Sequence, residues 1–470
     1  MSYTLKSTAS NTGHTDVSCF DQPGQLSVEQ GRQALLDAMS TANSPKVIAC
    51  ELSQLVGHVL AEDVISPINV PAQTNAAMDG FALALPEDHH QSPEANYEAH
   101  YILVGHSLAG HGFDGTLRTG EAVTITTGAP VPAGANTVVM REICQLDTDN
   151  TDTVIIQKPE SLRLNDNIRQ AGEDLQQGQI ALSAGTRLGA AHQGLIASLG
   201  LTQVAVFKPL VVAVFSTGDE VVAQGQPLPP HSIYDTNRYT LIGLLKKLHC
   251  QVIDLGILPD QETVLASTLA SAAAQADVVI SSGGVSVGVA DYIKTALTQV
   301  GEIGFWRINI RPGRPLAFGR IGPINGEQID NAPTEPEKSE KSAWFFGLPG
   351  NPVAVMVTFM QLAQPALRAL QGEPLRSDKH GLEGSTGGAL TAFPAQASEA
   401  MRSREGRTDF HRGIYSLSPQ GQLQVRTTGT QGSGILRSMT EANCLIEIPD
   451  AQARVTEGEM VRIYPFADLL

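Results

Sequence analysis

The pattern of apolar and polar positions changes character along the 470 residues of the chain. Residues 98–160 carry short apolar runs between Gly, Pro and Asn, which predict β-structure. Residues 205–372 carry longer apolar runs that alternate with segments of helical length. Continuous apolar strands alternating with helices indicate a parallel sheet that is covered on both faces. We therefore expect a doubly wound α/β domain together with β-rich segments.

Local signals add elements around this domain. Ser27 and Gln30 form a capping-box pattern at the start of a helix that runs to about residue 39. Residues 187–200 predict a second helix, which Gly200 closes. From about residue 385 to the end, β-character returns and suggests a small barrel. The predicted fold class is multidomain α/β plus β, with a C-terminal β-barrel.

Two segments lack apolar periodicity and are predicted to lie outside the packed domains. Residues 1–26 are polar and predict a disordered lead-in without the apolar core of a signal peptide. Residues 325–343 are acidic and contain proline, so we interpret them as a surface loop inserted into the α/β domain.

Charge and cysteine usage narrow the classes of function. The net charge of −17 disfavours nucleic acid and anionic membranes as partners of the whole surface. The five cysteines are scattered without metal-ligand spacing, which is typical of free thiols in a reducing compartment. No run of about 20 apolar residues is present, so we expect no membrane span. These features favour a cytoplasmic protein.

Three loops that follow predicted strands are rich in small residues. In an open parallel sheet, ligands bind beyond the carboxyl ends of the strands. Small side chains allow backbone N–H groups to approach an anion such as phosphate. The alternative is that these loops are only tight turns, and neither dinucleotide nor P-loop spacing is present. The candidate binding residues are Ser216, Thr217 and Gly218 in the first loop, Ser282, Gly283, Gly284, Ser286 and Gly288 in the second, and Pro349 and Pro352 in the third.

A cluster of arginines follows the second loop. Arg307, Arg311, Arg314 and Arg320 lie within 14 residues that contain no acid. Guanidinium groups bind phosphate and other oxyanions through paired donors. A solvated charged surface is the alternative interpretation.

Several carboxylates lie close to these loops in the sequence. Carboxylates beside phosphate-binding loops suggest a hard cation such as Mg²⁺. Each acid is also consistent with a helix cap or a turn, and Asp291 fits either the N-cap of the next helix or a metal ligand. The candidate acids are Asp79, Asp174, Glu220, Asp260 and Asp291.

Taken together, the motifs resemble a known family. The segments NAAMDGFAL, TTGAPVPAGANTVVM, AGEDLQQGQ, STGDEVV, IYDTNRYTL, SSGGVSVGVADYIK, IRPGRPLAFG and GLPGNPVAVMVTF are similar to those of the molybdopterin molybdenumtransferase (MoeA) family, which includes the gephyrin E domain. The resemblance covers residues 27–470. It implies an enzyme that takes adenylylated molybdopterin and molybdate, inserts the metal, and releases AMP with the help of a Mg²⁺-type ion.

The resemblance also implies an organisation into domains. Residues 27–46 and 205–372 would form the α/β molybdopterin-binding domain, and residues 380–470 the C-terminal barrel. Residues 47–66 and 166–204 would form an elongated linker domain, and residues 67–165 a β-rich lobe. A homodimer is implied, with an active cleft that draws on both chains, and a complex with molybdopterin adenylyltransferase is a further possible partner.

Position by position, the resemblance assigns site residues. The catalytic set would be Asp79, Thr127, Asp174, Glu220, Asp260 and Asp291, with Glu220, Asp260 and Asp291 as metal ligands. Pro349 and Pro352 shape the pocket, and Arg412 and Ser433 align with positions linked to molybdate or substrate. Where the family has lysines, this chain has Arg307, Arg311 and Arg314, which retain the charge but exclude any role for a deprotonated amine.

Two other functions stay open on the same residues. A non-catalytic molybdopterin-binding scaffold of the gephyrin type would need the loops but not the acids. A molybdopterin adenylyltransferase would need the α/β domain but not the β-rich segments that surround it.

Overall fold

The computed structural model describes residues 25–86, 98–147, 152–157, 162–284, 292–322, 341–374 and 390–468. These residues fold into two compact units. Unit 1 comprises Met1–Ile48, Gly57–Val59 and Phe207–Leu470, and unit 2 comprises Ala49–Val56 and Leu60–Val206. The chain passes between the units through β2 (Val47–Glu51) and β13 (Gln203–Phe207).

The centre of unit 1 is a mixed sheet. Its described strands are, in spatial order, β1 (Gln25–Leu26), β19 (Gly301–Ile308), β21 (Pro315–Ile321), β22 (Ala343–Leu348), β18 (Val278–Ser282), β14 (Val211–Thr217) and β17 (Gln251–Leu258). β22, β18, β14 and β17 run parallel to one another, and β21 is antiparallel to both of its neighbours. β1 and β19 are parallel to each other, so among the described strands of this sheet only β21 departs from the parallel arrangement expected from the sequence.

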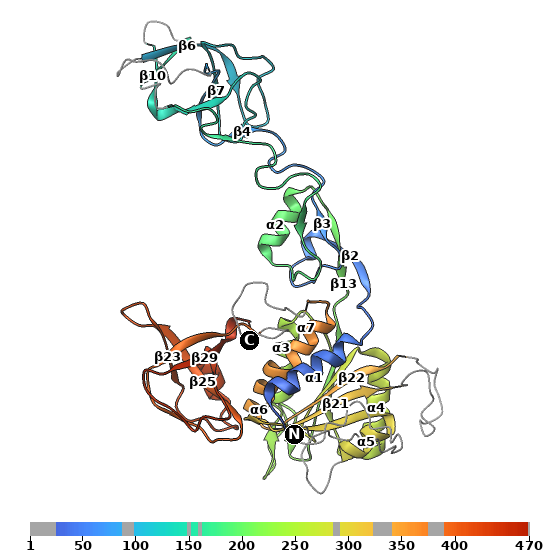
Figure 1. Cartoon of the computed structure of the whole chain (residues 1–470). Helices are drawn as coiled ribbons and strands as arrows, with labels where there is room; N and C mark the ends of the chain where they lie inside the picture. Colours follow the sequence, from blue (N-terminus) through green and yellow to red (C-terminus); the bar gives the residue numbers. More distant parts are fainter. Residues whose placement is uncertain are drawn as a thin grey trace, which may run out of the picture. The chain divides into compact units, whose positions relative to one another are not determined.

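Helices cover both faces of this sheet (Figure 1). They are α1 (Val28–Ser40), α3 (Asn237–Lys247), α4 (Glu262–Gln275), α5 (Tyr292–Val300), α6 (Pro352–Thr358), the π-helix η5 (Phe359–Ala363) and α7 (Gln364–Leu370). Alternate residues of β14 enter different cores. Val212 and Val214 pack with α1, α3 and α6, while Ala213 and Phe215 pack with α4 and α5. This alternation is what a strand buried on both faces requires, and it confirms the doubly wound architecture.

The N-terminal boundary differs slightly from the prediction. The capping box of Ser27 and Gln30 is present at the start of α1, as expected. However, Gln25 and Leu26, which were placed in the disordered lead-in, form β1 and pair in parallel with Arg307 and Ile308. Leu26 packs against the main core, and this apolar contact orders the last two residues of the predicted lead-in.

The predicted loop insertion lies largely outside the described residues, but its last residue is structured. Ala343 is buried and begins β22, because the apolar run of that strand starts there. The helical run Pro352–Leu370 is long and apolar enough to cross a membrane by length and composition alone. Its apolar window is 89% buried inside the protein, which is the environment of a core helix.

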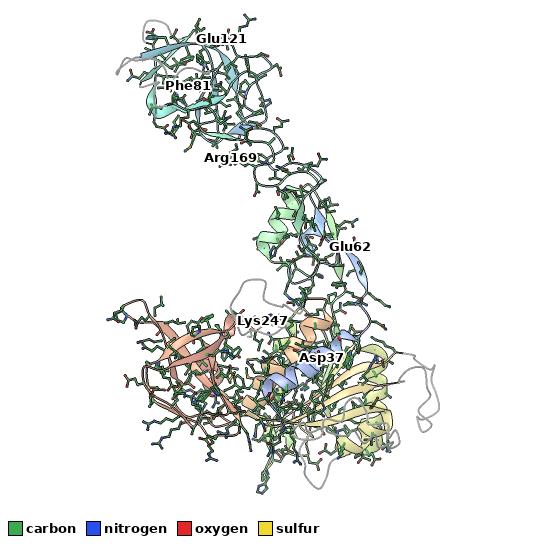
Figure 2. The ribbon with its side chains drawn as sticks, in the orientation of Figure 1. Asp37, Glu62, Phe81, Glu121, Arg169 and Lys247 are labelled. Carbon is green, nitrogen blue, oxygen red and sulfur yellow. The ribbon has the colours of Figure 1, made fainter. Side chains whose placement is uncertain are left out.

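The C-terminal part of unit 1 is a closed barrel. Its described strands follow the order β25 (Thr408–Leu417), β26 (Leu423–Thr427), β23 (Phe393–Ala397), β29 (Met460–Pro465) and β27 (Cys444–Ile448), and β27 pairs again with β25. Smaller elements of this part are β20 (Ile310–Arg311), β24 (Met401–Arg402), α8 (Arg437–Glu441), β28 (Arg454–Val455) and η6 (Phe466–Asp468). β20 adds to β25, and Lys247 Nζ on α3 donates to the carbonyl of Ala467 at 3.3 Å (Figure 2). Backbone pairing and a side-chain hydrogen bond thus join the barrel to the α/β part of unit 1.

Unit 2 is built from β-structure around small cores. The described strands of its main sheet follow the order β8 (Thr137–Met140), β5 (Gly80–Leu83), β7 (Glu121–Ile125), β6 (Glu98–Ser107), β10 (Thr153–Gln157) and β9 (Cys144–Leu146). Its other elements are η1 (Leu52–Gln54), β3 (Val64–Ile65), β4 (Asn75–Ala76), η3 (Arg141–Ile143), β11 (Ile168–Arg169), β12 (Ile180–Leu182) and α2 (Ala190–Ser198). Phe81 lies in the core of the main sheet (Figure 2). The helix predicted over residues 187–200 is confirmed, with Gly200 at a φ of +75° after its end.

Candidate functional site

The three small-residue loops meet at the carboxyl ends of β14, β18 and β22. A Cβ placed on Gly283 would lie 2.8 Å from the carbonyl oxygen of Thr217, and one on Gly350 would lie 3.9 Å from the Cα of Gly283. Gly283 has a φ of +91°, so both its conformation and the close approach of β14 require glycine. Its N–H donates to the carbonyl of Leu348 at 3.1 Å. The N–H of Gly283 is therefore used to join the second loop to β22, and a ligand would be bound by other groups of these loops.

Asn237 holds two of these loops together. Its Nδ2 donates to the hydroxyl of Ser282 at 2.8 Å and to the carbonyl of Gly350 at 2.7 Å. The sequence reading did not single out this residue, although it lies in the DTNR segment that begins α3. The feature of the sequence that could have identified Asn237 is its position: it is an amide residue at the start of a helix that follows a strand-end loop.

A buried ion-pair network supports the first loop. Ser216 donates to Asp235 at 2.9 Å, and Asp235 pairs with Arg238 at 2.7 Å. Arg238 also pairs with Asp254 at 2.5 Å. Burial would lower the pKa of Arg238, but its bonds to the two carboxylates raise it. The network fixes the start of α3, and with it Asn237, next to Ser216 and Thr217.

Two of the predicted acids lie beside the first loop. Thr217 donates its hydroxyl to Asp260, and a Cβ on Gly218 would lie 2.7 Å from Glu220 Oε2. Asp260 thus contacts Thr217, and Glu220 lies against the next residue, Gly218. Ser281 lies opposite Phe215 of β14, fully buried, with a hydroxyl that has no hydrogen-bond partner in the described part of the chain.

One predicted metal ligand, Asp291, and two predicted binding residues of the second loop lie outside the described residues. Asp291, Ser286 and Gly288 belong to residues 285–291, which the structure does not describe. Within the described residues, no group of three or more His, Cys, Asp and Glu is arranged to hold a metal ion. The carboxylate oxygens of Asp260 and Glu220 are of the type that Mg²⁺ prefers.

The arginine cluster separates into different environments. Arg307 is exposed on β19, whereas Arg320 donates to Ser342 at 2.7 Å and stacks on Trp344. Arg311 pairs with Asp409 of the barrel at 2.9 Å. The local sequence around the arginines contains no acid, but the fold supplies one from about 100 residues away. Arg314 is half-buried, and its Nε has no hydrogen-bond partner among the described residues.

The two predicted barrel residues are joined through one loop. Arg412 is 1% exposed, and its guanidinium donates to the Ser438 hydroxyl at 3.0 Å and to the Gly432 carbonyl at 3.1 Å. Burial lowers the pKa of Arg412 to about 10. Ser433 accepts a hydrogen bond at its carbonyl from the N–H of Val353 at 3.1 Å. Arg412 thus holds residue 432 while Ser433 contacts α6, near Pro352, the first residue of that helix, and the buried Pro349.

The predicted site residues of unit 2 form a separate pair. Asp79 accepts hydrogen bonds from the Thr127 N–H at 2.6 Å and from the Thr127 hydroxyl at 2.8 Å. These bonds hold the pKa of the exposed Asp79 below its ordinary value. Asp174 is also exposed, on the turn after Gly172. The pairing of Asp79 with Thr127 keeps a charged carboxylate at the surface of this unit.

Comparison with known proteins identifies the family. Residues 26–200 match the MoeA N-terminal region (domain I and II), residues 213–369 a probable molybdopterin binding domain, and residues 394–466 the MoeA C-terminal region (domain IV). A molybdopterin molybdenumtransferase from Haemophilus influenzae is 40% identical over 447 residues, which are 95% of this chain and 100% of that protein. The chain belongs to the MoeA family.

Other MoeA relatives agree over most of the chain. The crystal structure of a molybdopterin biosynthesis MoeA protein from Pyrococcus horikoshii superimposes with a TM-score of 0.73 at 26% identity, covering 94% of this chain and 99% of that one. A molybdopterin molybdenumtransferase from Nostoc is 33% identical and covers 87% of this chain and 86% of its own length. Gephyrin from Dictyostelium discoideum is 28% identical over 93% of this chain, which spans 61% of gephyrin. The family resemblance expected from the motifs is confirmed.

Proposed function

We propose that this chain is a molybdopterin molybdenumtransferase, which inserts molybdenum from molybdate into adenylylated molybdopterin and releases AMP. The observation that carries the proposal is the 40% identity to the Haemophilus influenzae enzyme over that enzyme's whole length. The meeting of three small-residue loops beside Asp260 supports it, because this is the arrangement in which open α/β sheets bind ligands.

The roles of the loop residues follow from their contacts. The phosphates of the nucleotide substrate would lie against Ser282, Gly284, Ser286 and Gly288, with Thr217 and Gly218 closing the first loop. Asn237 would act as a positioning residue, because its amide joins the second loop to the third. The loops would thereby orient the phosphoanhydride bond and exclude part of the surrounding water.

A divalent ion, Mg²⁺ in our proposal, would be held by Glu220, Asp260 and Asp291. When bound, it would neutralise phosphate charge and polarise the phosphoanhydride as a Lewis acid. The hydrogen bond from Thr217 to Asp260 orients this carboxylate towards the first loop. A carboxylate that is oriented before the ligand arrives needs less reorganisation on binding.

Molybdate would be received by cationic and hydroxyl donors. Arg307 and Arg314 would supply charge next to the loops, and Ser433 a hydroxyl. Arg311 would contribute the part of its guanidinium that Asp409 leaves unused, since the pair is bonded through one nitrogen. Arg412 would act indirectly, by holding residue 432 beside Ser433.

The remaining proposals concern assembly and location. Asp79, Thr127 and Asp174 of a partner subunit would complete the cleft in a homodimer. A complex with molybdopterin adenylyltransferase would deliver the substrate, and the reaction would take place in the cytoplasm. Nucleic acid and membranes are not proposed as partners.

The assay is the release of AMP from adenylylated molybdopterin in the presence of Mg²⁺ and molybdate. We expect molybdate-dependent AMP release, a loss of at least about 100-fold in Asp260→Ala, and ordinary turnover in the control Asp37→Ala, an acid on α1 away from the loops. Binding of the substrate without AMP release would support the scaffold function instead. Consumption of ATP and molybdopterin with release of pyrophosphate would support the adenylyltransferase.

A further inference from the structure

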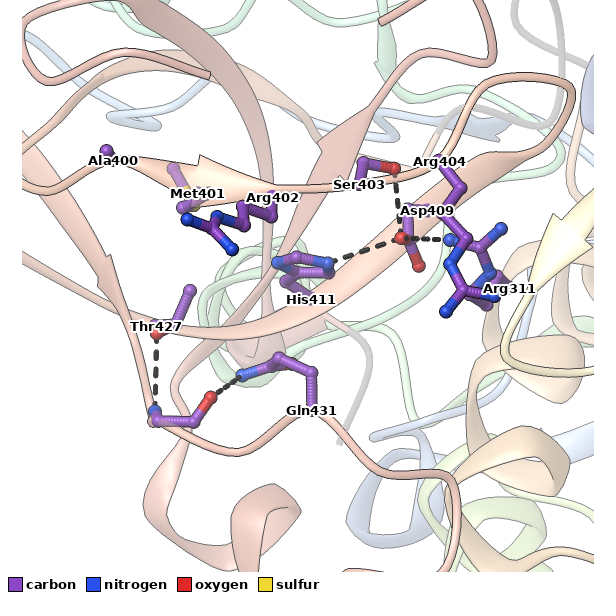
Figure 3. A pocket seen from close by; sticks show the side chains of 11 residues that line it. Arg311, Ala400, Met401, Arg402, Ser403, Arg404, Asp409, His411, Thr427 and Gln431 are labelled. Atoms are coloured by element: carbon purple, nitrogen blue, oxygen red, sulfur yellow. Dashed lines mark hydrogen bonds and ion pairs between the residues drawn. The ribbon is translucent and has the colours of Figure 1, made fainter. Parts of the chain in front are cut away.

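A cavity of about 480 Å³ opens on the barrel (Figure 3). Its wall comes from β20, β24, the segment that joins β24 to β25, β25 itself, and the end of β26 with the loop that follows. No residue of the strand-end loops lines it. The lining residues that carry the argument are Arg311, Arg402, Arg404, Asp409, His411 and Gln431.

The charges that face this cavity are unbalanced. Three arginines line it, against the single carboxylate of Asp409. That carboxylate already accepts bonds from Arg311 at 2.9 Å, from Ser403 at 3.0 Å and from His411 at 3.3 Å. Arg402 and Arg404 are exposed, and within the described chain neither side chain makes an ion pair or a hydrogen bond. Two guanidinium groups at the cavity are therefore available to a ligand.

Further arginines lie beside the cavity, and the neighbouring Glu399 carboxylate is already bonded to the Thr427 N–H and hydroxyl at 2.8 and 2.6 Å. Arg402 lies directly opposite Arg454 in the β24–β28 ladder, and like charges in that position repel. Burial, together with the charges of Arg314 and Arg311, lowers the pKa of the nearby Arg407. This concentration of unpaired arginine occurs in a chain whose net charge is −17. A bound anion would relieve the repulsion.

We propose that this cavity binds the phosphate group of a phosphorylated small molecule of about nucleotide size. Guanidinium groups bind phosphate oxygens through paired, charge-assisted hydrogen bonds, which Arg402 and Arg404 are free to make. The cavity volume lies within the range of small-molecule pockets, and a four-oxygen anion would leave most of it empty. A nucleoside monophosphate has the required charge and size. The inference goes beyond the proposed function, because Arg402 and Arg404 have no role in that function and only Arg311 is shared with the proposed molybdate site.

The test is calorimetric titration of the full chain with AMP and, separately, with inorganic phosphate. We expect the unchanged protein to bind one AMP per chain at this cavity. In the double variant Arg402→Ala/Arg404→Ala, the affinity of this binding event should fall at least about tenfold. The matched control Arg426→Ala/Arg437→Ala removes the same charge from exposed barrel positions outside the cavity and should keep that event. Inorganic phosphate should bind the cavity at least about tenfold more weakly than AMP.

A variant of the strand-end loops separates this cavity from the proposed active site. Asn237→Ala should leave the arginine-dependent AMP event intact. The proposal is overturned if the arginine double variant binds AMP as the unchanged protein does, or if the control variant loses binding equally. It is also overturned if Asn237→Ala abolishes the event, or if inorganic phosphate binds as tightly as AMP. Failure of AMP release in the transferase assay would leave these outcomes unaffected.

Discussion

The buried pair of Arg238 and Asp235 provides the sharpest test of how the site is supported. The side chain of Asp235 is 1% exposed and that of Arg238 is 7% exposed, whereas the second partner, Asp254, is 43% exposed. Arg238→Met keeps the length of the side chain but leaves the Asp235 carboxylate buried without its cation. Breaking a buried pair in this way costs about 3–5 kcal/mol, chiefly because of the charge left behind.

Two double variants locate the origin of that cost. Neutralising the stranded charge in Asp235→Asn/Arg238→Met should return most of the lost stability, to within about 1–2 kcal/mol of the unchanged protein. Asp254→Asn/Arg238→Met should recover little, because Asp254 is largely solvated.

Tryptophan fluorescence during guanidinium unfolding measures this effect in unit 1 alone. The chain has two tryptophans, and Trp306 and Trp344 both lie in the main core of unit 1. The midpoint of the fluorescence transition therefore reports on this unit without a contribution from unit 2. The reasoning is refuted if Arg238→Met costs less than about 1 kcal/mol, or if both double variants are as unstable as the single one.

Three further predictions concern other parts of unit 1. Gly313→Ala should destabilise the protein by about 1–3 kcal/mol in the same fluorescence titration, because residue 313 has a φ of +103° and a Cβ would meet the Thr358 hydroxyl; an unchanged midpoint would contradict this. Burial raises the pKa of Asp409, but its bonds to His411 and Arg311 outweigh this and hold that pKa below its ordinary value. The stability that Asp409 provides should therefore be complete above about pH 4 and disappear as the pH falls through the lowered pKa. The difference in free energy of unfolding between the unchanged protein and Asp409→Asn should shrink over this pH range. A difference that stays constant down to low pH would contradict this prediction. Burial raises the pKa of Cys444 to about 12, so mass spectrometry should find it alkylated at pH 8 only after unfolding, and rapid labelling of the native protein would count against its burial.

Much of the fold follows from local sequence patterns. The alternation of apolar strands and helices over residues 205–372 predicts the α/β core, since each strand is long enough to be buried on both faces. The capping box at Ser27 and the terminating Gly200 are local signals, and both are confirmed. The turn at Pro312-Gly313 predicts a strand-turn-strand over residues 301–321, and β19 and β21 form this antiparallel pair. The pairing of β21 with β22 on its other side is long-range, and no local pattern specifies it.

The parts of the candidate site that follow from backbone structure could be predicted from the sequence. The parts that depend on contacts between distant residues could not. The small-residue loops could be located because they follow strands whose carboxyl ends must meet at one edge. The pairing of Arg311 with Asp409 joins residues 98 positions apart, so the cluster appeared free of acids when read locally. The hydrogen bonds of Asn237 could not be predicted for the same reason, since its partners Ser282 and Gly350 belong to two other loops.

The central claim is that the strand-end loops of unit 1 bind the phosphates of adenylylated molybdopterin. A crystal structure of the protein with this nucleotide and Mg²⁺ tests it most directly. The account predicts phosphate density within hydrogen-bonding distance of Ser282 and Gly284, with the metal ion bound to Asp260. Density for the nucleotide phosphates only elsewhere, with these loops empty, would contradict it.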